Sequence, residues 1–201
     1  LACLVGLPLV CFGGWEMVLV GAACVLFCFL YTTLLAQHGM GDVLVLLFFG
    51  LVPVCLTYYV TMPPASQTIT AQVVWASLAC GLVIDTLLVV NNYRDYDQDR
   101  AVGKKTLIVR MGRERAEQLY GWLGNIATYM MWGCLVLGDS SFVLMLVCFA
   151  CFVPYALLHG ATRVQMRRIG RGKELNKVLG MTARNMFVFG VTTAIVTLFI
   201  L

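Results

Sequence analysis

The feature that most constrains this chain is a succession of apolar stretches, each close to the length that crosses a lipid bilayer. Six such segments follow a shorter one at the start of the sequence. A helix needs about 20 apolar residues to span the hydrocarbon core, and most of the six approach that length. The six segments cover residues 15–35, 43–62, 69–90, 119–137, 142–159 and 181–201.

Composition indicates that lipid is the solvent of most side chains. Of the 201 residues, 61% are hydrophobic and 12% are charged. The charged share is about half that of an average soluble domain. A water-soluble fold of this size could not bury so many apolar side chains. The sequence therefore predicts an all-α, polytopic bundle of transmembrane helices, forming a single domain over residues 1–201.

The opening apolar run, residues 1–12, is too short to span a bilayer. It lacks the basic leading region and the small-residue cleavage site of a signal peptide. We therefore expect the chain to begin partway through a helix, with residues upstream absent.

The basic residues predict how the helices are oriented. All fourteen Lys and Arg lie in two regions, 94–115 and 163–184, whereas the breaks near Gly13, Pro63 and Gly138 have none. Counting helices between the regions places both on one side of the membrane, and the positive-inside rule makes that side cytoplasmic. This distribution predicts a membrane protein and argues against nucleic acid as a partner, despite the net charge of +4.

The segment from Asn91 to Leu107 carries the chemistry, and it begins where an apolar helix reaches the basic side. Asp95 and Asp99 are four residues apart, so they lie on one face if the helix continues. Two such carboxylates repel each other unless a cation or a proton lies between them. Magnesium prefers oxygen ligands and bridges carboxylates to substrate phosphates. We predict a Mg²⁺ site made by Asp95, Asp99 and the amide oxygen of Asn91, one turn earlier.

Basic residues in the same segment can bind phosphate. Lys104 and Lys105 follow Gly103 and can pair with phosphate oxygens. The alternative is a solvated acidic turn, balanced by Arg94 and Arg100. A DxxxD spacing alone does not decide between the two, but the preceding asparagine pair and the following GKKT favour a substrate site.

These residues resemble the second aspartate-rich motif of the UbiA superfamily of intramembrane aromatic prenyltransferases. The resemblance is strongest to the branch that prenylates 1,4-dihydroxy-2-naphthoate in menaquinone synthesis, whose motif is close to NNxRDxxxDRxxGKxTLxVRxG. The matching residues are Asn91, Asn92, Arg94, Asp95, Asp99, Arg100, Gly103, Lys104, Thr106, Leu107, Val109, Arg110 and Gly112.

The layout of the chain is similar to that family as well. The family has nine transmembrane helices, with this motif between the sixth and the seventh. The resemblance implies that about seven are present here, and that the first two and part of the third are missing. Tyr31 and the Gly-Met-Gly-Asp run at 39–42 resemble the family's loop between helices four and five. Tyr31 and Asp42 are therefore expected to bind substrate, although Asp42 could equally cap the helix that starts at Val43.

Two departures from the family pattern stand out. The first aspartate-rich motif, NxxxDxxxD, is absent and would lie upstream of Leu1. The cation that usually follows the loop tyrosine is also absent, since residues 32–37 contain none, and Gln37 or His38 would have to substitute. We expect the 201-residue chain alone to be inactive, because it holds one of the two metal-binding motifs.

The resemblance implies transfer of a polyprenyl group from its diphosphate to 1,4-dihydroxy-2-naphthoate. Loss of the carboxyl group would give demethylmenaquinone. Asp95 and Asp99 would be the catalytic residues, and the chain would lie in a bacterial inner membrane with the Asp95 loop in the cytoplasm. The residues implied to bind substrate are Asn91, Asn92, Arg94, Lys104, Tyr31 and Asp42.

Other functions stay open on the sequence alone. A related enzyme could use another aromatic acceptor, such as 4-hydroxybenzoate, and a non-enzymatic membrane protein is a further alternative. A CDP-alcohol phosphotransferase would need an Asp-Gly-x-x-Ala-Arg stretch, and none follows Asp95 or Asp99. Asp85 lies deeper in its apolar segment, seven residues before Asn92, and favours a function or a buried hydrogen bond over exposure to lipid.

Overall fold

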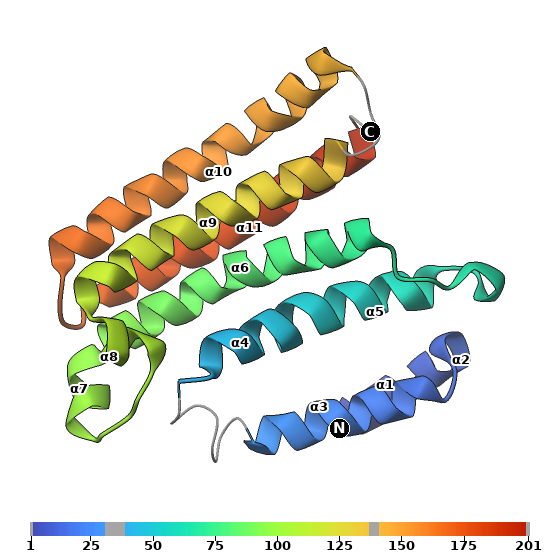
Figure 1. The fold of residues 1–201 in the computed structure, drawn as a ribbon, viewed down its shortest axis with the longest axis horizontal. Helices are drawn as coiled ribbons and strands as arrows, with labels where there is room; N and C mark the ends of the chain where they lie inside the picture. The colour runs from blue at the N-terminus through green and yellow to red at the C-terminus, as the bar shows by residue number, and fades with distance from the viewer. Residues whose placement is uncertain (1, 31–38, 137–140, 200–201) are drawn as a thin grey trace.

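The computed structural model describes residues 2–30, 39–136 and 141–199, and all of its regular elements in these ranges are helical (Figure 1). Four helical segments are long and apolar enough to cross a membrane: Gly41–Thr61, Ala71–Arg94, Phe142–Ile169 and Leu175–Leu198. The chain is therefore an integral membrane protein, and the predicted polytopic helical bundle is confirmed.

The elements follow one another along the chain with short connections. They are α1 (Ala2–Gly6), the 3₁₀ turn η1 (Leu7–Leu9), α2 (Val10–Gly13), α3 (Glu16–Leu30), α4 (Gly41–Val45), the π-helical η3 (Leu46–Leu51), α5 (Val52–Thr61), the 3₁₀ turn η4 (Pro64–Ser66), α6 (Ala71–Arg94), α7 (Tyr96–Ala101), α8 (Leu107–Met111), α9 (Arg113–Val136), α10 (Phe142–Ile169) and α11 (Leu175–Phe199).

The helices extend further than the apolar segments that predicted them. The apolar run expected to end at His159 continues as α10 to Ile169, and α11 begins at Leu175, before the run at 181. At 1.5 Å per residue, the 28 residues of α10 measure about 42 Å, which exceeds a hydrocarbon core of about 30 Å. Helical hydrogen bonds thus continue into the headgroup layer, where polar side chains are solvated.

Helices α6, α9, α10 and α11 form the tightly packed part of the bundle (Figure 1). One core cluster centres on Phe152 and Phe189, whose rings lie 5.6 Å apart. A second cluster, built around Tyr93 and Met166, lies nearer the motif. Buried polar groups pair between helices: the Tyr120 and Thr182 hydroxyls lie 3.0 Å apart. This block fixes the end of α6, from which the motif emerges.

Helix α4 and the π-helical η3 pack closely on α6. A Cβ on Gly50 would lie 2.7 Å from the Gly81 Cα, so only glycine lets the two backbones approach this far. Pro53 has no N–H and excludes the carbonyl four residues before it, and the turn that precedes it is widened to a π-helix. The close approach of these segments brings the start of α4 to the end of α6.

Helices α1 to α3 cover the other side of α4 and α5 (Figure 1). Helix α3 has no buried residue. The contacts that hold this region include the Phe27 and Phe48 rings at 5.1 Å, and a hydrogen bond of 2.8 Å from Gln67 Nε2 to the Phe12 carbonyl. This region is therefore attached to the rest of the bundle more loosely than α6 is.

Candidate functional site

A small polar pocket lies where the start of α4 meets the end of α6 and the loop before α8. Its volume is about 110 Å³. It brings together four residues that the sequence predicted to bind substrate: Asp42, Asn91, Asn92 and Lys104. The other lining residues are Gly39, Gly41, Leu88 and Thr106.

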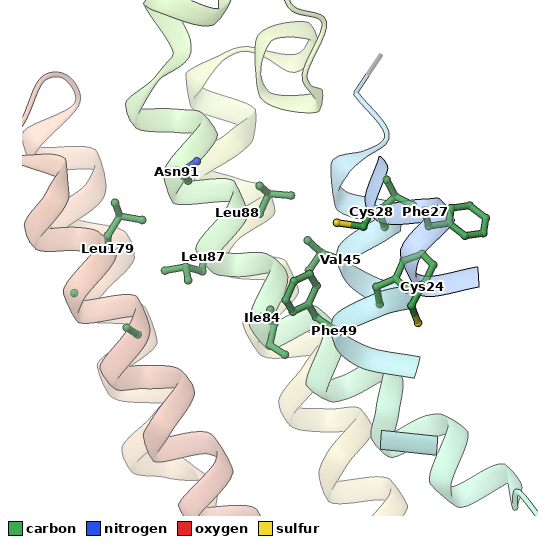
Figure 2. A pocket seen from close by; sticks show the side chains of 14 residues that line it. Cys24, Phe27, Cys28, Val45, Phe49, Ile84, Leu87, Leu88, Asn91 and Leu179 are labelled. Carbon is green, nitrogen blue, oxygen red and sulfur yellow. The ribbon is translucent and has the colours of Figure 1, made fainter. Parts of the chain in front are cut away.

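A larger apolar cavity of about 880 Å³ adjoins this pocket. Its walls come from α3, α4, η3, α6 and α11. Figure 2 shows Ile84, Leu87 and Leu88 in succession along α6, with Asn91 at the end of the row. Leu88 and Asn91 line both spaces. The two spaces together fit an amphiphile with a long apolar tail and a small charged head.

The backbone keeps the motif residues one turn apart although α6 ends at Arg94. The Asp95 N–H donates to the Asn91 carbonyl at 3.1 Å, and the Asp99 N–H donates to the Asp95 carbonyl at 2.8 Å. The helical hydrogen-bond spacing therefore runs from Asn91 through Asp99. The side chains of Arg94, Asp95 and Asp99 are not among those that line the polar pocket.

Basic side chains of the same segment bind both motif carboxylates. Arg94 donates to both Asp95 oxygens, at 2.7 and 2.8 Å. This hydrogen bonding holds the pKa of the Asp95 carboxyl below its ordinary value. Lys104 Nζ lies 3.1 Å from Asp99 Oδ1, and Asp99 is buried. Each motif carboxylate thus has a cation of the chain itself beside it.

The oxygens of this segment fit Mg²⁺ in donor type. The Arg94 Nη2 donates both to Asn91 Oδ1 and to Asp95 Oδ2, each at 2.8 Å, so these two oxygens already converge on one cationic group. Carboxylate and amide oxygens are ligands that Mg²⁺ accepts. Within residues 2–30, 39–136 and 141–199, no group of three or more His, Cys, Asp or Glu side chains could hold a metal ion. The predicted Mg²⁺ ligands are two carboxylates, from Asp95 and Asp99, and one amide, from Asn91.

Arg113 holds the motif in place, and the sequence did not single it out. Its guanidinium donates to the carbonyls of Tyr93 and Gly170, and to Asp97 Oδ2 at 3.0 Å. It also lies 4.9 Å from the ring centres of both Tyr93 and Tyr96. The only sequence signal was a cation directly after the motif's last glycine.

The two basic regions meet at one end of the bundle, as the helix count predicted. Besides the bond from Arg113 to the Gly170 carbonyl, Arg94 Nη1 donates to Asn176 Oδ1 at 3.0 Å. Figure 1 shows α7, α8 and the turn between α10 and α11 at this same end. The loop carrying the motif is therefore tied to the loop between the last two helices.

The segment before α4 closes the pocket. Gly39 has φ +77°, and a Cβ there would collide with the Lys105 carbonyl, so this position needs glycine. Thr106 caps α8 by accepting from the Val109 N–H at 3.2 Å. The alternative cap role for Asp42 is wrong: α4 begins at Gly41 with Met40 at the N-cap position, which places Asp42 inside the first turn. Tyr31, Gln37 and His38 lie outside the described residues.

The fold and this site define a class: an integral membrane protein in which a polar pocket and an apolar cavity share lining residues beside paired acids and cations. Residues 1–177 match the sequence model of the UbiA prenyltransferase family, and the chain belongs to that family. The resemblance based on the motif is thereby confirmed, and membership argues against the phosphotransferase and the non-enzymatic alternatives.

Three similar proteins share the name 1,4-dihydroxy-2-naphthoate octaprenyltransferase. The Mycobacterium tuberculosis protein is 34% identical over 96% of this chain and 63% of its own length. The Mycobacterium leprae protein is 32% identical over 94% of this chain and 61% of its own. The Escherichia coli protein is 33% identical over 59% of this chain and 32% of its own. The chain thus spans less than two thirds of these relatives, and no solved structure gives a significant match.

Proposed function

We propose that the protein transfers a polyprenyl group from its diphosphate to 1,4-dihydroxy-2-naphthoate, with loss of the carboxyl group, giving demethylmenaquinone. The observation that carries this proposal is the junction of the polar pocket and the apolar cavity at Leu88 and Asn91. Such a junction suits a substrate with a charged head and a long hydrocarbon tail. The names of the relatives support the acceptor.

The donor binds with its tail in the apolar cavity and its diphosphate at the polar pocket. Burial of the tail against Ile84, Leu87 and Phe49 supplies binding energy through the hydrophobic effect. The same apolar walls exclude water, which would otherwise capture the allylic cation formed as the C–O bond breaks. Lys104 faces the pocket and pairs with phosphate oxygens as a point charge.

Asp95, Asp99 and Asn91 hold Mg²⁺ in this proposal. When bound, the ion neutralises the charge of the departing diphosphate. Arg94, which bridges Asn91 and Asp95, keeps those two oxygens turned toward each other and adds a positive charge beside the leaving group. Tyr31 remains a predicted contact to the same substrate.

The acceptor binds beside Asp42 and Asn92, which line the same pocket as Lys104. Their oxygens accept hydrogen bonds from ring hydroxyls and so orient the ring carbon toward the allylic cation. A hydroquinone ring is electron-rich, so its carbon captures the cation without a strong general base. The basic residues of both loops support the proposal that this end of the bundle faces the cytoplasm from a bacterial inner membrane.

The acceptor assay tests the proposal. Membranes that contain the full-length protein receive Mg²⁺, a long-chain prenyl diphosphate and equal amounts of 1,4-dihydroxy-2-naphthoate and 4-hydroxybenzoate. We expect a prenylated, decarboxylated naphthol as the main product. Preferential prenylation of 4-hydroxybenzoate with its carboxyl group retained would contradict the proposal and support the alternative acceptor.

A further inference from the structure

Asn176, in the first turn of α11, contacts the motif from a distant part of the chain. Its Oδ1 accepts a hydrogen bond from Arg94 Nη1 at 3.0 Å, although the two residues are 82 positions apart. Asn176 lines neither the polar pocket nor the apolar cavity. Any effect of Asn176 on the site must therefore pass through Arg94.

Buried neighbours fix the place of Asn176 relative to the motif. Leu175 and Val178, on either side of it in the chain, are fully buried. Both belong to the core cluster that also contains Tyr93, the residue before Arg94. The chain segments that carry the donor and the acceptor of this hydrogen bond are thus anchored in one packed cluster, which gives the contact a rigid support.

The hydrogen bond to Asn176 completes the set of contacts around the Arg94 guanidinium. Nε and Nη2 donate to the two Asp95 oxygens, at 2.7 and 2.8 Å. Nη2 also donates to Asn91 Oδ1 at 2.8 Å. A guanidinium is planar and carries its N–H groups in a fixed fork, so an acceptor at Nη1 also sets where the other N–H groups point. Without the Asn176 oxygen, the outer end of Arg94 could turn about its paired edge with Asp95.

Arg94 in turn fixes the side-chain amide of Asn91. Arginine has donors but no acceptor, so the Asn91 atom that faces it must be the amide oxygen. Asn91 lines both the polar pocket and the apolar cavity, whereas Arg94 lines neither. Figure 2 shows the Asn91 nitrogen at the end of the row of apolar side chains on α6. The contact with Arg94 therefore occupies the oxygen end of the amide and leaves its N–H₂ end to donate to a ligand.

We propose that Asn176 is a positioning residue for the prenyl diphosphate: by holding Arg94, it fixes the Asn91 amide with its N–H₂ group toward the polar pocket, where that group donates to a diphosphate oxygen. The identity of the ligand rests on the proposed function, in which Lys104 pairs with the same head group. Asn91 Oδ1 has a second lone pair, so its predicted contact with Mg²⁺ is retained.

Binding of inorganic pyrophosphate to the purified full-length protein, in the presence of Mg²⁺, tests the contact without turnover. Asn176→Ala should weaken this binding about three- to tenfold, the range for one lost hydrogen bond to a charged group that acts through a second residue. Asn176→Asp keeps an oxygen at the same position and should recover most of the affinity. Asn125→Ala is the matched control, because Asn125 is an exposed asparagine of α9 that lines neither space. It should bind pyrophosphate as the wild type does.

A double-mutant cycle tests whether Asn176 acts through Arg94. Methionine at position 94 has no N–H to donate, so Asn176→Ala should weaken pyrophosphate binding by less than about twofold further in the Arg94→Met background. In steady-state kinetics, Asn176→Ala should raise the KM for the prenyl diphosphate and leave the KM for the aromatic acceptor unchanged. The increase should be the same for geranyl diphosphate and for a long-chain donor, because the two share only the head group.

Several results would overturn the inference, and one separates it from the proposed function. Unchanged pyrophosphate affinity in Asn176→Ala would refute the positioning role. Full additivity with Arg94→Met would show that Asn176 acts independently of Arg94, and equal increases in both KM values would show a general structural role. A wild-type protein that bound no pyrophosphate would contradict the inference and the proposed donor together. The expected binding pattern in a protein that prenylates no aromatic acceptor would contradict the proposed function and leave the positioning role supported.

Discussion

Helices α3 and α6 face the same apolar cavity, yet they are held in very different ways. Helix α6 has nine buried residues and packs against α4, η3, α9 and α11, whereas α3 has none. Both contribute lining side chains, including Cys24 and Phe27 from α3 and Ile84 and Leu87 from α6. The cavity therefore has one firmly packed wall, which ends in the polar motif, and one loosely attached wall made only of apolar side chains.

This difference separates two tasks. Catalytic groups must be held within a few tenths of an ångström of their working positions, and a packed helix with buried neighbours provides that rigidity. A flexible hydrocarbon tail needs apolar surface but no fixed partner, so a loosely packed helix serves it well. The effects of substitutions on the two walls are accordingly expected to differ in kind as well as in size.

The largest effect is expected at the polar end of the packed wall. Asp95→Ala and Asp99→Ala each remove a proposed metal ligand and should lower turnover by about 100-fold or more, since metal stabilisation of leaving-group charge is worth several kcal/mol. Folding should survive, because the cations that lose their partners, Arg94 and Lys104, reach solvent. Turnover in membranes and thermal unfolding in detergent measure the two properties separately.

Asp97→Asn provides the matched control for those variants. Asp97 lies between the two acids in the chain, but its side chain is 62% exposed and pairs with Arg113 instead. Its replacement should change turnover by less than about threefold, as expected for an exposed ion pair. Near-normal turnover in both alanine variants would refute the metal assignment.

The second-largest effect is expected on the stability of the protein, and it differs between the two walls. A Cβ on Gly50 would lie 2.7 Å from the Gly81 Cα and 2.8 Å from the Ser77 carbonyl oxygen, both of which belong to the backbone of α6. Gly50→Ala should therefore lower the free energy of unfolding by about 3 kcal/mol, the cost of overpacking a rigid contact. Denaturant unfolding of the full-length protein in micelles gives this value.

Gly21→Ala is the corresponding change on the loose wall. No atom lies within 4 Å of a Cβ on Gly21, which is in the middle of α3. Alanine favours a helix over glycine, so this variant should be unchanged or more stable by about 0.5–1 kcal/mol. Equal destabilisation by both alanine substitutions would show that the two walls are packed alike.

The sequence alone predicted the properties that depend on local pattern. Apolar segment lengths predicted the helical membrane fold, and the distribution of basic residues predicted that both basic loops lie at one end. The motif predicted which part of the chain lies at the pocket, because Asn91, Asn92 and Lys104 are close together in sequence. The end of α10 and the start of α11 were predicted less well, since helical hydrogen bonding extends beyond the apolar pattern.

Properties that depend on how helices pack were not predicted. Arg113 binds carbonyls at the ends of α6 and α10, and the latter is 57 residues away in the chain. The close approach of η3 to α6 depends on the contact of Gly50 with Gly81, which one sequence does not reveal. Periodicity assigns a residue to a face of its helix, but the neighbouring helix decides what that face meets.

The smallest effect is expected where a side chain is added to the cavity itself. Gly180 of α11 lines the apolar cavity, and no atom lies within 4 Å of a Cβ placed there. Gly180→Leu should therefore fold normally but reduce the space for a long tail, raising the KM for a long-chain prenyl diphosphate about three- to tenfold, or roughly 1 kcal/mol. The KM for geranyl diphosphate, with only two isoprene units, should hardly change. Gly190→Leu is the control, because Gly190 is exposed on the same helix with equal room for a side chain but does not line the cavity. If Gly190→Leu discriminated between long and short donors as strongly as Gly180→Leu, the cavity would not be the site of the tail.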